Sequence, residues 1–441
     1  MMIKQVKLLV AIMLLLGTGI YAQQVYPTFS KTLDNGLKVV VCEKPGGNFV
    51  QTEVWYRVGS KNEVDGIRGM AHLFEHMMFR GTDKFPGDTL WKSVRKVGGY
   101  LNAYTTFDRT VYHQNIPKNY LSNMLEMEAD RMDKFKVTQE ILDIEREVVG
   151  EELLLGNNNW YRKAISKRYE GLHPKDHPYS VDIIGYLEEI RKFTAEQCRA
   201  FHNDFYSPNN AFVLVVGDIK HEEVFTICQK YFGPITKQRT IKEVDSLPNL
   251  FDHKVVEEKI ELGYPLQIYG FTYPRPAVAS EDVFALNMFV DLMFSTENSI
   301  LNQRLVKIDQ PLASVIISNS STWSMYPTTG VIDIVMDARP GNARVKKIVR
   351  AELDSAAVNG VDPQLMNDYI EALSAKLMLG SYTAENVASQ LGMAEFYFND
   401  VNVAFKEVAY YKAVTMEDIK RVAAKYFSLD KVRVINMLPP Q

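Results

Sequence analysis

The stretch Arg68–Thr82, RGMAHLFEHMMFRGT, sets two histidines and one glutamate in an almost wholly apolar run. Nothing between Gly69 and Gly81 breaks a helix, so a helix is predicted here. Residues four apart share one helix face, which brings the imidazoles of His72 and His76 to the same spot. Burying ionisable groups without partners costs several kcal/mol for each group. The stretch therefore predicts a charge or a metal ion among these side chains.

The order of these groups is His-x-x-Glu-His, the inverzincin motif. Two imidazoles at this spacing can bind one Zn²⁺ at about 2.0–2.1 Å each. Glu75 lies next to their face, where a carboxylate can take a proton from water that attacks a peptide carbonyl. The alternative is that both histidines are hydrogen-bonded core residues. Three ionisable groups in one apolar helix favour the metal.

A catalytic zinc site takes a third protein ligand and leaves one position for water. The best source is the acidic helix predicted over residues 141–155. Glu145 and Glu152 are seven residues apart and share a face with Val148 and Val149, an apolar stripe that we expect to turn inward. Spacing by itself gives the two glutamates equal claim to be the third ligand.

Length and composition set the limits on the protein class. The chain has 441 residues, enough for two domains, and 46% apolar with 24% charged residues is typical of a globular enzyme. The net charge is −4 and the sequence contains no basic run, so no nucleic-acid partner is expected. Three scattered cysteines do not form a disulfide framework.

The N-terminus reads as a secretory signal peptide over residues 1–22. A short cationic start precedes an apolar stretch from Leu8 to Ala22, and Ala22 is a suitable residue before a cleavage site. This stretch is shorter than the roughly 20 residues that span a bilayer. We expect cleavage after Ala22, no stable membrane span in the mature chain, and a periplasmic or secreted protein.

The mature chain divides at a polar region without an apolar period. Residues 241–252 are the predicted linker between an N-terminal domain, 23–240, and a C-terminal domain, 253–441. Residues 285–296 can be laid on residues 70–81, with Met293-Phe294 over Met78-Phe79. One short match leaves an internal duplication open.

Six motifs in this order resemble the pitrilysin family of zinc metallopeptidases, in the branch of the mitochondrial processing peptidase and its bacterial relatives. They are DNGLKVVV (34–41), HLFEHMMFRGT (72–82), GGYLNAYTTFDRTVYH (98–113), IEREVVGEE (144–152), HPYSVDIIG (177–185) and FYSPNNAFVLVVGDI (205–219). The resemblance implies an α+β fold with two similar α/β halves facing each other around a chamber. Each half would be a mostly antiparallel sheet packed with helices, and the first alone would carry zinc, one ion per chain.

The resemblance also assigns roles to residues. It implies that Glu152 is the third zinc ligand beside His72 and His76, and that Glu145 supports catalysis next to the metal. It implies that the LNAY strand, through Asn102 and Ala103, binds an extended peptide substrate by backbone pairing. The implied activity is that of a zinc-dependent endopeptidase acting on peptides or unfolded protein segments.

One departure from the family concerns an Arg/Tyr pair that many relatives carry in the second half. In the matching stretch this chain has Lys307 and Ser314, which supply neither a guanidinium fork nor a phenol. We therefore predict a sibling subunit that supplies the pair in a heterodimer, or a homodimer. The alternative is a non-catalytic structural or assembly subunit of the same fold, which the intact metal-site motif argues against.

Overall fold

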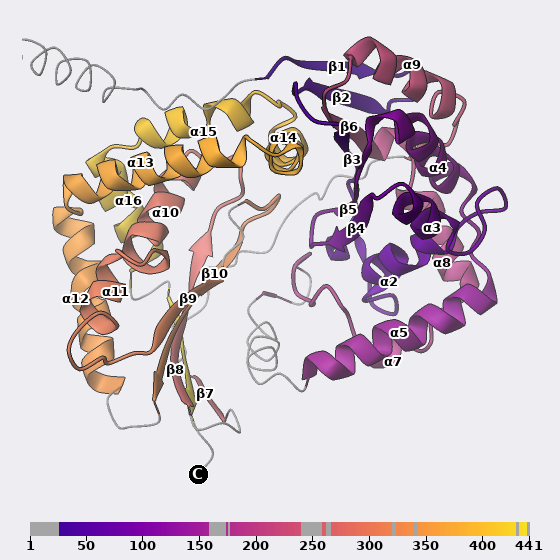
Figure 1. Cartoon of the computed structure of the whole chain (residues 1–441). Coiled ribbons are helices and arrows are strands. Elements are labelled where there is room, and N and C mark those ends of the chain that lie inside the picture. The colour runs from indigo at the N-terminus through magenta and orange to yellow at the C-terminus, as the bar shows by residue number, and fades with distance from the viewer. Residues whose placement is uncertain are drawn as a thin grey trace, which may run out of the picture.

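The computed structural model describes most of the chain (Figure 1), over residues 26–157, 173–174, 177–239, 258–261, 266–319, 323–337, 342–428 and 432–438. The predicted signal peptide, residues 1–22, and the predicted linker, residues 241–252, lie outside these ranges. Within them, no helix combines the length and apolar character needed to cross a bilayer. The described residues form two sheets with helices packed against them.

The first sheet belongs to the N-terminal half and has the strand order β1-β2-β6-β3-β5-β4. Its strands are β1 (Thr28–Thr32), β2 (Lys38–Glu43), β3 (Phe49–Tyr56), β4 (Tyr100–Thr105), β5 (Thr110–Pro117) and β6 (Ala211–Gly217). The helices of this half are α2 (Met70–Met77), α3 (Thr89–Lys96), α4 (Leu121–Lys134), α5 (Gln139–Asn157), α7 (Leu187–Ile190), α8 (Ala195–Phe205) and α9 (His221–Tyr231). The short 3₁₀ turns are η1 (Ser60–Asn62), η2 (Met78–Arg80), η3 (Lys118–Tyr120) and η4 (Pro208–Asn210).

The second sheet has the order β7-β11-β8-β10-β9. Its strands are β7 (Glu258–Glu261), β8 (Leu266–Arg275), β9 (Val315–Asn319), β10 (Thr328–Asp337) and β11 (Arg433–Leu438). The helices are α10 (Val283–Val290), the π-turn η5 (Asp291–Ser295), α11 (Ile300–Leu305), α12 (Asn342–Asn359), α13 (Pro363–Gly380), α14 (Ala384–Phe398), α15 (Val403–Lys412) and α16 (Met416–Tyr426).

The two sheets share one connectivity. In the first, β2 pairs in parallel with β6, the last strand of its half, and β6, β3, β5 and β4 then pair antiparallel. In the second, β7 pairs in parallel with β11, and β11, β8, β10 and β9 follow the same antiparallel order. Helix α2 lies between β3 and β4 in the chain as α10 lies between β8 and β9. The fold therefore contains the internal duplication that the sequence left open.

Alternation along the strands gives the first sheet two buried faces. On β3, Val50, Val54 and Tyr56 face a core formed with α2, α4, α8 and α9. Trp55 points to the opposite face and belongs to a separate apolar cluster. Because side chains alternate along a strand, β3 contributes to both layers.

The outer face of the first sheet is covered by the second half of the chain. Helix α14 packs on β3 and β6 and lies between the halves in Figure 1. Trp55 and Phe212 of the sheet form one apolar cluster with Leu391 and Phe396 of α14. A Cβ atom on Gly392 would lie 2.2 Å from the Trp55 ring, so the helix approaches closely here. This apolar cluster therefore joins the two halves.

Candidate metal centre

Helix α2 begins where the sequence predicts, and a buried carboxylate fixes its start. Glu63, only 3% exposed, accepts hydrogen bonds from the backbone N–H groups of Gly69 (2.7 Å) and Ala71 (2.8 Å). These are among the amides that have no partner within the helix. Glu63 thus sets the position of the helix that carries the motif.

Side chains from α2 and α5 converge on one point. The Nε2 atoms of His72 and His76 lie 3.8 Å and 3.6 Å from Oε2 of Glu152. These distances are too long for good hydrogen bonds. They are close to the separation of about 3.4 Å between donors that share a tetrahedral Zn²⁺ at 2.0–2.1 Å. One donor atom from each of the three residues lies within 4.8 Å of the others, so the set fits one such ion.

The surroundings shift the pKa values of the two histidines in opposite directions, and the shift at His72 suits metal binding. Burial, together with the charge of His76, lowers the pKa of His72 to about 4, so this imidazole is neutral at pH 7. A neutral imidazole is the form that coordinates a metal. Burial would by itself lower the pKa of His76. Its hydrogen bond to Glu145 and the charges of Glu75, Glu145 and Glu152 outweigh burial and raise that pKa.

Glu145 contacts the imidazole of His76 on the side away from Glu152. It is 1% exposed, and its Oε2 atom lies 3.4 Å from Nδ1 of His76, the nitrogen that faces away from Glu152. Its other oxygen accepts a hydrogen bond from Arg80. Burial would raise the pKa of Glu145, but the bonds to His76 and Arg80 outweigh burial and lower it. A carboxylate behind a ligating imidazole fixes the orientation of the ring.

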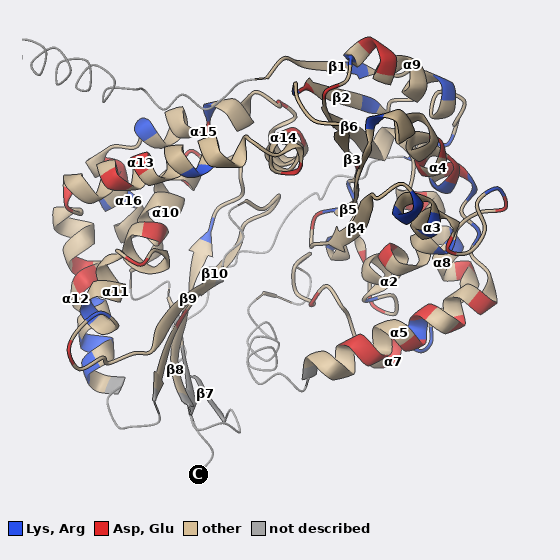
Figure 2. Ribbon diagram, in the orientation of Figure 1, with Lys and Arg blue, Asp and Glu red and all other residues tan. Residues whose placement is uncertain are grey.

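Figure 2 shows the acidic residues gathered along α5, the helix that carries both glutamates. The sequence predicts that Val148 and Val149 turn inward together. That prediction is correct for Val149, which is fully buried, and wrong for Val148, which is 42% exposed. Adjacent residues on a helix are about 100° apart, and on α5 only Val149 is turned into the core.

Glu75 lies beside the imidazoles and has a partner of its own. Its Oε2 atom accepts a hydrogen bond of 2.7 Å from the hydroxyl of Thr105, the last residue of β4. Burial raises the pKa of Glu75, although the bond to Thr105 and the charge of His76 act against that rise. A raised pKa suits a carboxylate that must take up and release a proton near neutral pH.

A cavity of about 280 Å³ opens next to these groups. It is lined by Glu75, His76, Phe79, Arg80, Asp88, Trp91, Asn102, Glu145 and Val148. The rings of Phe79 and Trp91 pack at 5.1 Å between centroids and give the cavity an aromatic wall. The proposed base and one proposed ligand therefore face a space that can receive a side chain.

The LNAY strand lies at an open edge of the first sheet. Strand β4 pairs only with β5, so its other side has no strand beside it among the described residues. The N–H of Ala103 donates to Oδ1 of Asn102 at 2.9 Å. Nδ2 of Asn102 donates to the hydroxyl of Tyr100 at 3.1 Å. An open edge with outward backbone groups can pair with an extended peptide.

Lys307 and Ser314 have partners within their own half. Nζ of Lys307 lies 3.9 Å from a carboxylate oxygen of Glu297, and the Ser314 hydroxyl donates to the carbonyl of Val335 at 3.1 Å. Both follow α11 in the chain, on the half without the histidine pair.

A second cluster of possible ligands has a different character. His221 directs Nδ1 at Glu43 (2.8 Å) and Nε2 at Glu222 (3.3 Å). One ion cannot use opposite nitrogens of one ring, and Glu43 already pairs with Lys220 at 2.7 Å. This cluster is a surface ion-pair network.

Sequence reasoning did not identify Glu63, Arg80 or Thr105. Arg80 lies four residues after His76 and so on the same side of the helical segment, a spacing that could have signalled it. Thr105 alternates with Leu101 and Ala103 along β4, which places it on the face toward α2. Glu63 gives no such signal, because a loop brings it to the helix.

Two family models match the chain. The one described as Insulinase (Peptidase family M16) matches residues 38–173, and the one described as Peptidase M16 inactive domain matches residues 192–373. The first range contains all the residues that converge at the candidate centre. The second contains α10, at the place of α2 in the second half.

Two curated relatives match nearly the whole chain. The zinc protease PqqE of Helicobacter pylori is 27% identical over 433 residues, which are 93% of this chain and 93% of the relative. The probable mitochondrial-processing peptidase subunit beta of Arabidopsis thaliana is 24% identical over 424 residues, 93% of this chain and 78% of the relative.

Solved structures share the fold. A protease from Helicobacter pylori matches with a TM-score of 0.85 at 24% identity, over 94% of this chain and 100% of that one. The periplasmic protease PqqL from Escherichia coli matches with a TM-score of 0.76 at 20% identity, over 95% of this chain and 48% of that one. These likenesses confirm the predicted α+β fold with two halves.

Proposed function

The chain belongs to peptidase family M16, the pitrilysin family that its motifs resemble, and we propose that it is a zinc-dependent endopeptidase. The observation that carries the proposal is the convergence of His72, His76 and Glu152 beside Glu75. Relatives named zinc proteases support the coarser reading as a protease of this family.

In this proposal His72, His76 and Glu152 hold one Zn²⁺. When bound, Zn²⁺ polarises a peptide carbonyl and brings the pKa of a coordinated water towards 7. Glu75 takes the proton from the attacking water and later gives it to the leaving amine. Thr105 holds the Glu75 carboxylate at 2.7 Å, and Glu145 holds the His76 ring, so neither group has to reorient during turnover.

The substrate is an extended peptide or an unfolded protein segment. It pairs with the open edge of β4, where the N–H of Ala103 becomes available once the Asn102 side chain turns aside. Backbone pairing grips any extended sequence, while side-chain pockets choose among residues. The cavity with the aromatic wall of Phe79 and Trp91 would take one substrate side chain.

A second chain completes the enzyme in this proposal. Lys307 and Ser314 stand where many members of the family carry an Arg/Tyr pair, and both are engaged within their own half. The chain spans 48% of the length of PqqL, whose single chain is therefore about twice as long. We expect a sibling subunit, or a second copy of this chain, to supply the other half of such an assembly.

The proposed location is outside the cytoplasm. A signal peptide over residues 1–22 would direct export, and the fold match PqqL is named a periplasmic protease. Mass spectrometry of the mature chain should find an N-terminus at Gln23. An unprocessed N-terminus would exclude the cleavage.

A non-catalytic subunit of the same fold is the second candidate, and substitution of Glu75 separates the two. Glu75→Gln should keep zinc, measured by elemental analysis, and lower kcat by about 10²–10⁴-fold because no base remains. The matched control is Glu151→Gln, which changes an exposed glutamate of α5 and should keep full activity. Cleavage of a quenched peptide by the wild-type chain with its partner should stop on addition of a chelator. Zinc binding without any chelator-sensitive cleavage would favour the non-catalytic subunit.

A further inference from the structure

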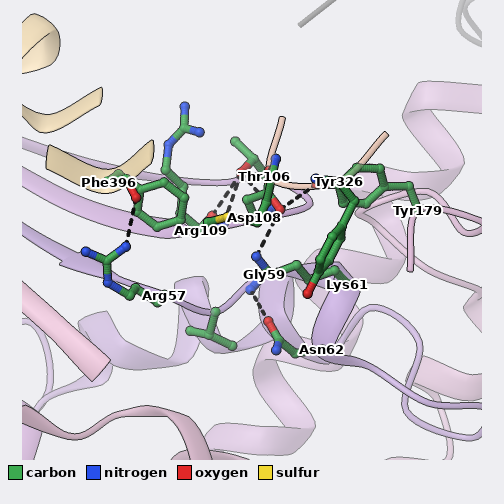
Figure 3. Close-up of polar contacts among 12 residues, drawn as sticks. Arg57, Gly59, Lys61, Asn62, Thr106, Asp108, Arg109, Tyr179, Tyr326 and Phe396 are labelled. Carbon is green, nitrogen blue, oxygen red and sulfur yellow. Dashed lines mark hydrogen bonds and ion pairs between the residues drawn. The ribbon is translucent and has the colours of Figure 1, made fainter. Parts of the chain in front are cut away.

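The turn between β4 and β5 carries a buried aspartate that both halves of the chain contact. Asp108 is 3% exposed. One carboxylate oxygen accepts from Nζ of Lys61 (2.9 Å) and the hydroxyl of Tyr179 (2.6 Å), both in the first half. The other accepts from the backbone N–H of Met325 (3.0 Å) and the hydroxyl of Tyr397 (3.2 Å), both in the second half. Figure 3 shows Asp108 at the centre of this network.

The charge of Asp108 is matched within the network. Lys61 is its ion-pair partner, and both side chains are less than 10% exposed. Burial would raise the pKa of Asp108, but the charge of Lys61 and the hydrogen bond from Tyr179 outweigh burial and lower it. A buried carboxylate with four donors has little freedom to move, because the loss of any donor leaves charge uncompensated.

The same turn is clamped to the body of the first half through its backbone. The amides of Ser60 and Lys61 donate to the carbonyls of Thr106 (3.2 Å) and Phe107 (3.0 Å) in the turn. A Cβ atom on Gly59 would lie 2.3 Å from the Thr106 oxygen, so only glycine permits this approach.

A second contact from α14 reaches the strand next to the turn. Arg109 donates from Nη1 to the hydroxyl of Tyr397 at 2.8 Å. Its guanidinium lies over the ring of Tyr104, 5.6 Å from the centroid, and Tyr104 belongs to β4. Directly after β3, the strand that pairs with β5, Arg57 donates to the carbonyl of Phe396 at 2.8 Å. The end of α14 therefore contacts both the turn of the hairpin and the end of the strand beside it.

The contacts of Asp108 with Met325 and Tyr397 form a brace between the halves, and this brace is close to the candidate active site. Thr105, which holds Glu75, is only three residues before Asp108. Strand β4 is the edge to which the substrate would bind, and in the part of the chain that the structure describes no strand supports its outer side. A displacement of the turn would therefore move both the substrate edge and the partner of the base.

We propose that Asp108 is a positioning residue through which the second half, by Met325 and Tyr397, fixes the β4–β5 hairpin against α2. The second half, which lacks the histidine pair, thereby sets the place of the substrate strand and of Thr105. This inference rests on the proposed function for its kinetic consequences, whereas the brace itself can be measured without activity. The competing reading is a buried ion pair that contributes stability alone.

Tyr397→Phe tests the proposal because it removes one hydroxyl and keeps the ring. Tyr369→Phe is the matched control: Tyr369 is also in the second half, and its hydroxyl donates to the carboxylate of Asp291 at 3.0 Å, within that half. In the full chain with its partner, Tyr397→Phe should raise KM for a long peptide by about three- to tenfold. Zinc content should stay unchanged. Amide hydrogen exchange over residues 98–113 should be faster than in the wild type.

Tyr369→Phe should lower the melting temperature while KM and exchange over residues 98–113 stay at wild-type values. Asp108→Asn should reproduce the Tyr397→Phe pattern more strongly, and Tyr397→Phe alone decides the question where that variant does not fold. Unchanged KM and unchanged exchange in Tyr397→Phe would overturn the proposal. A wild-type chain that binds zinc and cleaves nothing would refute the proposed function, and the exchange comparison would then test the brace by itself.

Discussion

Helices α2 and α10 occupy the same place in the two halves but carry different polar side chains. With residues 285–296 laid on residues 70–81, His72, Glu75 and His76 correspond to Asn287, Val290 and Asp291. Phe74 and Phe289 correspond as well, and both are fully buried. The apolar side of the helix is kept in both halves, while the polar side differs.

The polar groups of the second half satisfy one another. Oδ1 of Asn287 accepts from Nη2 of the buried Arg275 at 2.6 Å, and Asp291 accepts from Tyr369 at 3.0 Å. In the first half, by contrast, the two Nε2 atoms lie 3.6–3.8 Å from Glu152 and are not bonded to it. A closed hydrogen-bond network needs no ion, whereas an open set of donors around one point does.

A second pair of helices, α5 and α13, extends this correspondence. Tyr369 lies as far into α13 as Glu145 lies into α5, and each contacts the residue at the His76 position. Lys376 takes the place of Glu152 by the same count, and a lysine cannot bind the metal in its charged form. One architecture thus holds the proposed metal-binding arrangement in one half and a closed hydrogen-bond network in the other. Replacing a few side chains is enough to separate the two roles.

The largest effect is expected from substitution of His76, compared with substitution of Asp291 at the same place in the second half. His76→Ala should abolish zinc binding and reduce peptide cleavage to background, because two remaining donors hold Zn²⁺ poorly. Asp291→Ala should keep zinc and cleavage and lower only the melting temperature. Elemental analysis, a quenched-peptide assay and thermal unfolding measure the three quantities. Zinc retained at full occupancy in His76→Ala would remove this residue from the site.

An intermediate effect is expected at Glu145 and Tyr369, which contact the residues at the His76 position in the two halves. Glu145→Gln should weaken zinc affinity by about 10–100-fold, since the His76 ring loses the charge that orients it. Tyr369→Phe should leave zinc affinity unchanged and cost about 0.5–1.5 kcal/mol of unfolding free energy. Competition with a chromogenic chelator gives the affinities. Equal affinity for wild type and Glu145→Gln would show that Glu145 does not support the metal.

A substitution at the contact of α14 with β3 tests whether the two halves unfold as one cooperative unit. Gly392→Ala places a methyl group against the Trp55 ring and should cost about 1–3 kcal/mol of unfolding free energy. Gly380→Ala, at the end of α13, meets only a flexible glutamine at 3.3 Å and should change stability little. Calorimetry should show a single transition that moves down in Gly392→Ala. Two transitions, with only one of them moving, would mean that the halves unfold separately.

Acidification should destabilise the first half more than the second. This is the smallest of the four effects predicted in this Discussion. Seven of the eight histidines precede residue 253. His202 is one of them: burial and the charge of Lys237 lower its pKa to about 3. The unfolded chain binds this proton near pH 6.5, so stability is lost as pH falls through the window between the two values. Metal-free protein should lose about 1 kcal/mol between pH 7 and 5.5 through this group.

Amide hydrogen exchange measures this loss by region. After correction for the intrinsic exchange rate at each pH, protection in β3 and α8 should fall on acidification more than protection in β8 and β10. His202→Gln should remove part of the difference, because glutamine does not titrate. An equal loss of protection in both halves of the wild type would contradict the expected asymmetry.

The sequence by itself determined key elements and the chemistry of the first half. The helix with the motif and the helix over 141–155 both form where apolar period and punctuation place them. His72 and His76 are brought together by local geometry alone, because one turn of a helix separates them. The fold class and the family followed from the ordered motifs.

Only the tertiary structure decided what lies between elements that are distant in sequence. Spacing gave Glu145 and Glu152 equal claim, and the packing of α5 on α2 separates them: Glu152 faces both Nε2 atoms, and Glu145 contacts Nδ1 of His76. The brace at Asp108 joins residues more than 200 positions apart, which no local pattern encodes. Periodicity reports which face of an element is apolar, whereas partners across a core depend on how whole elements pack.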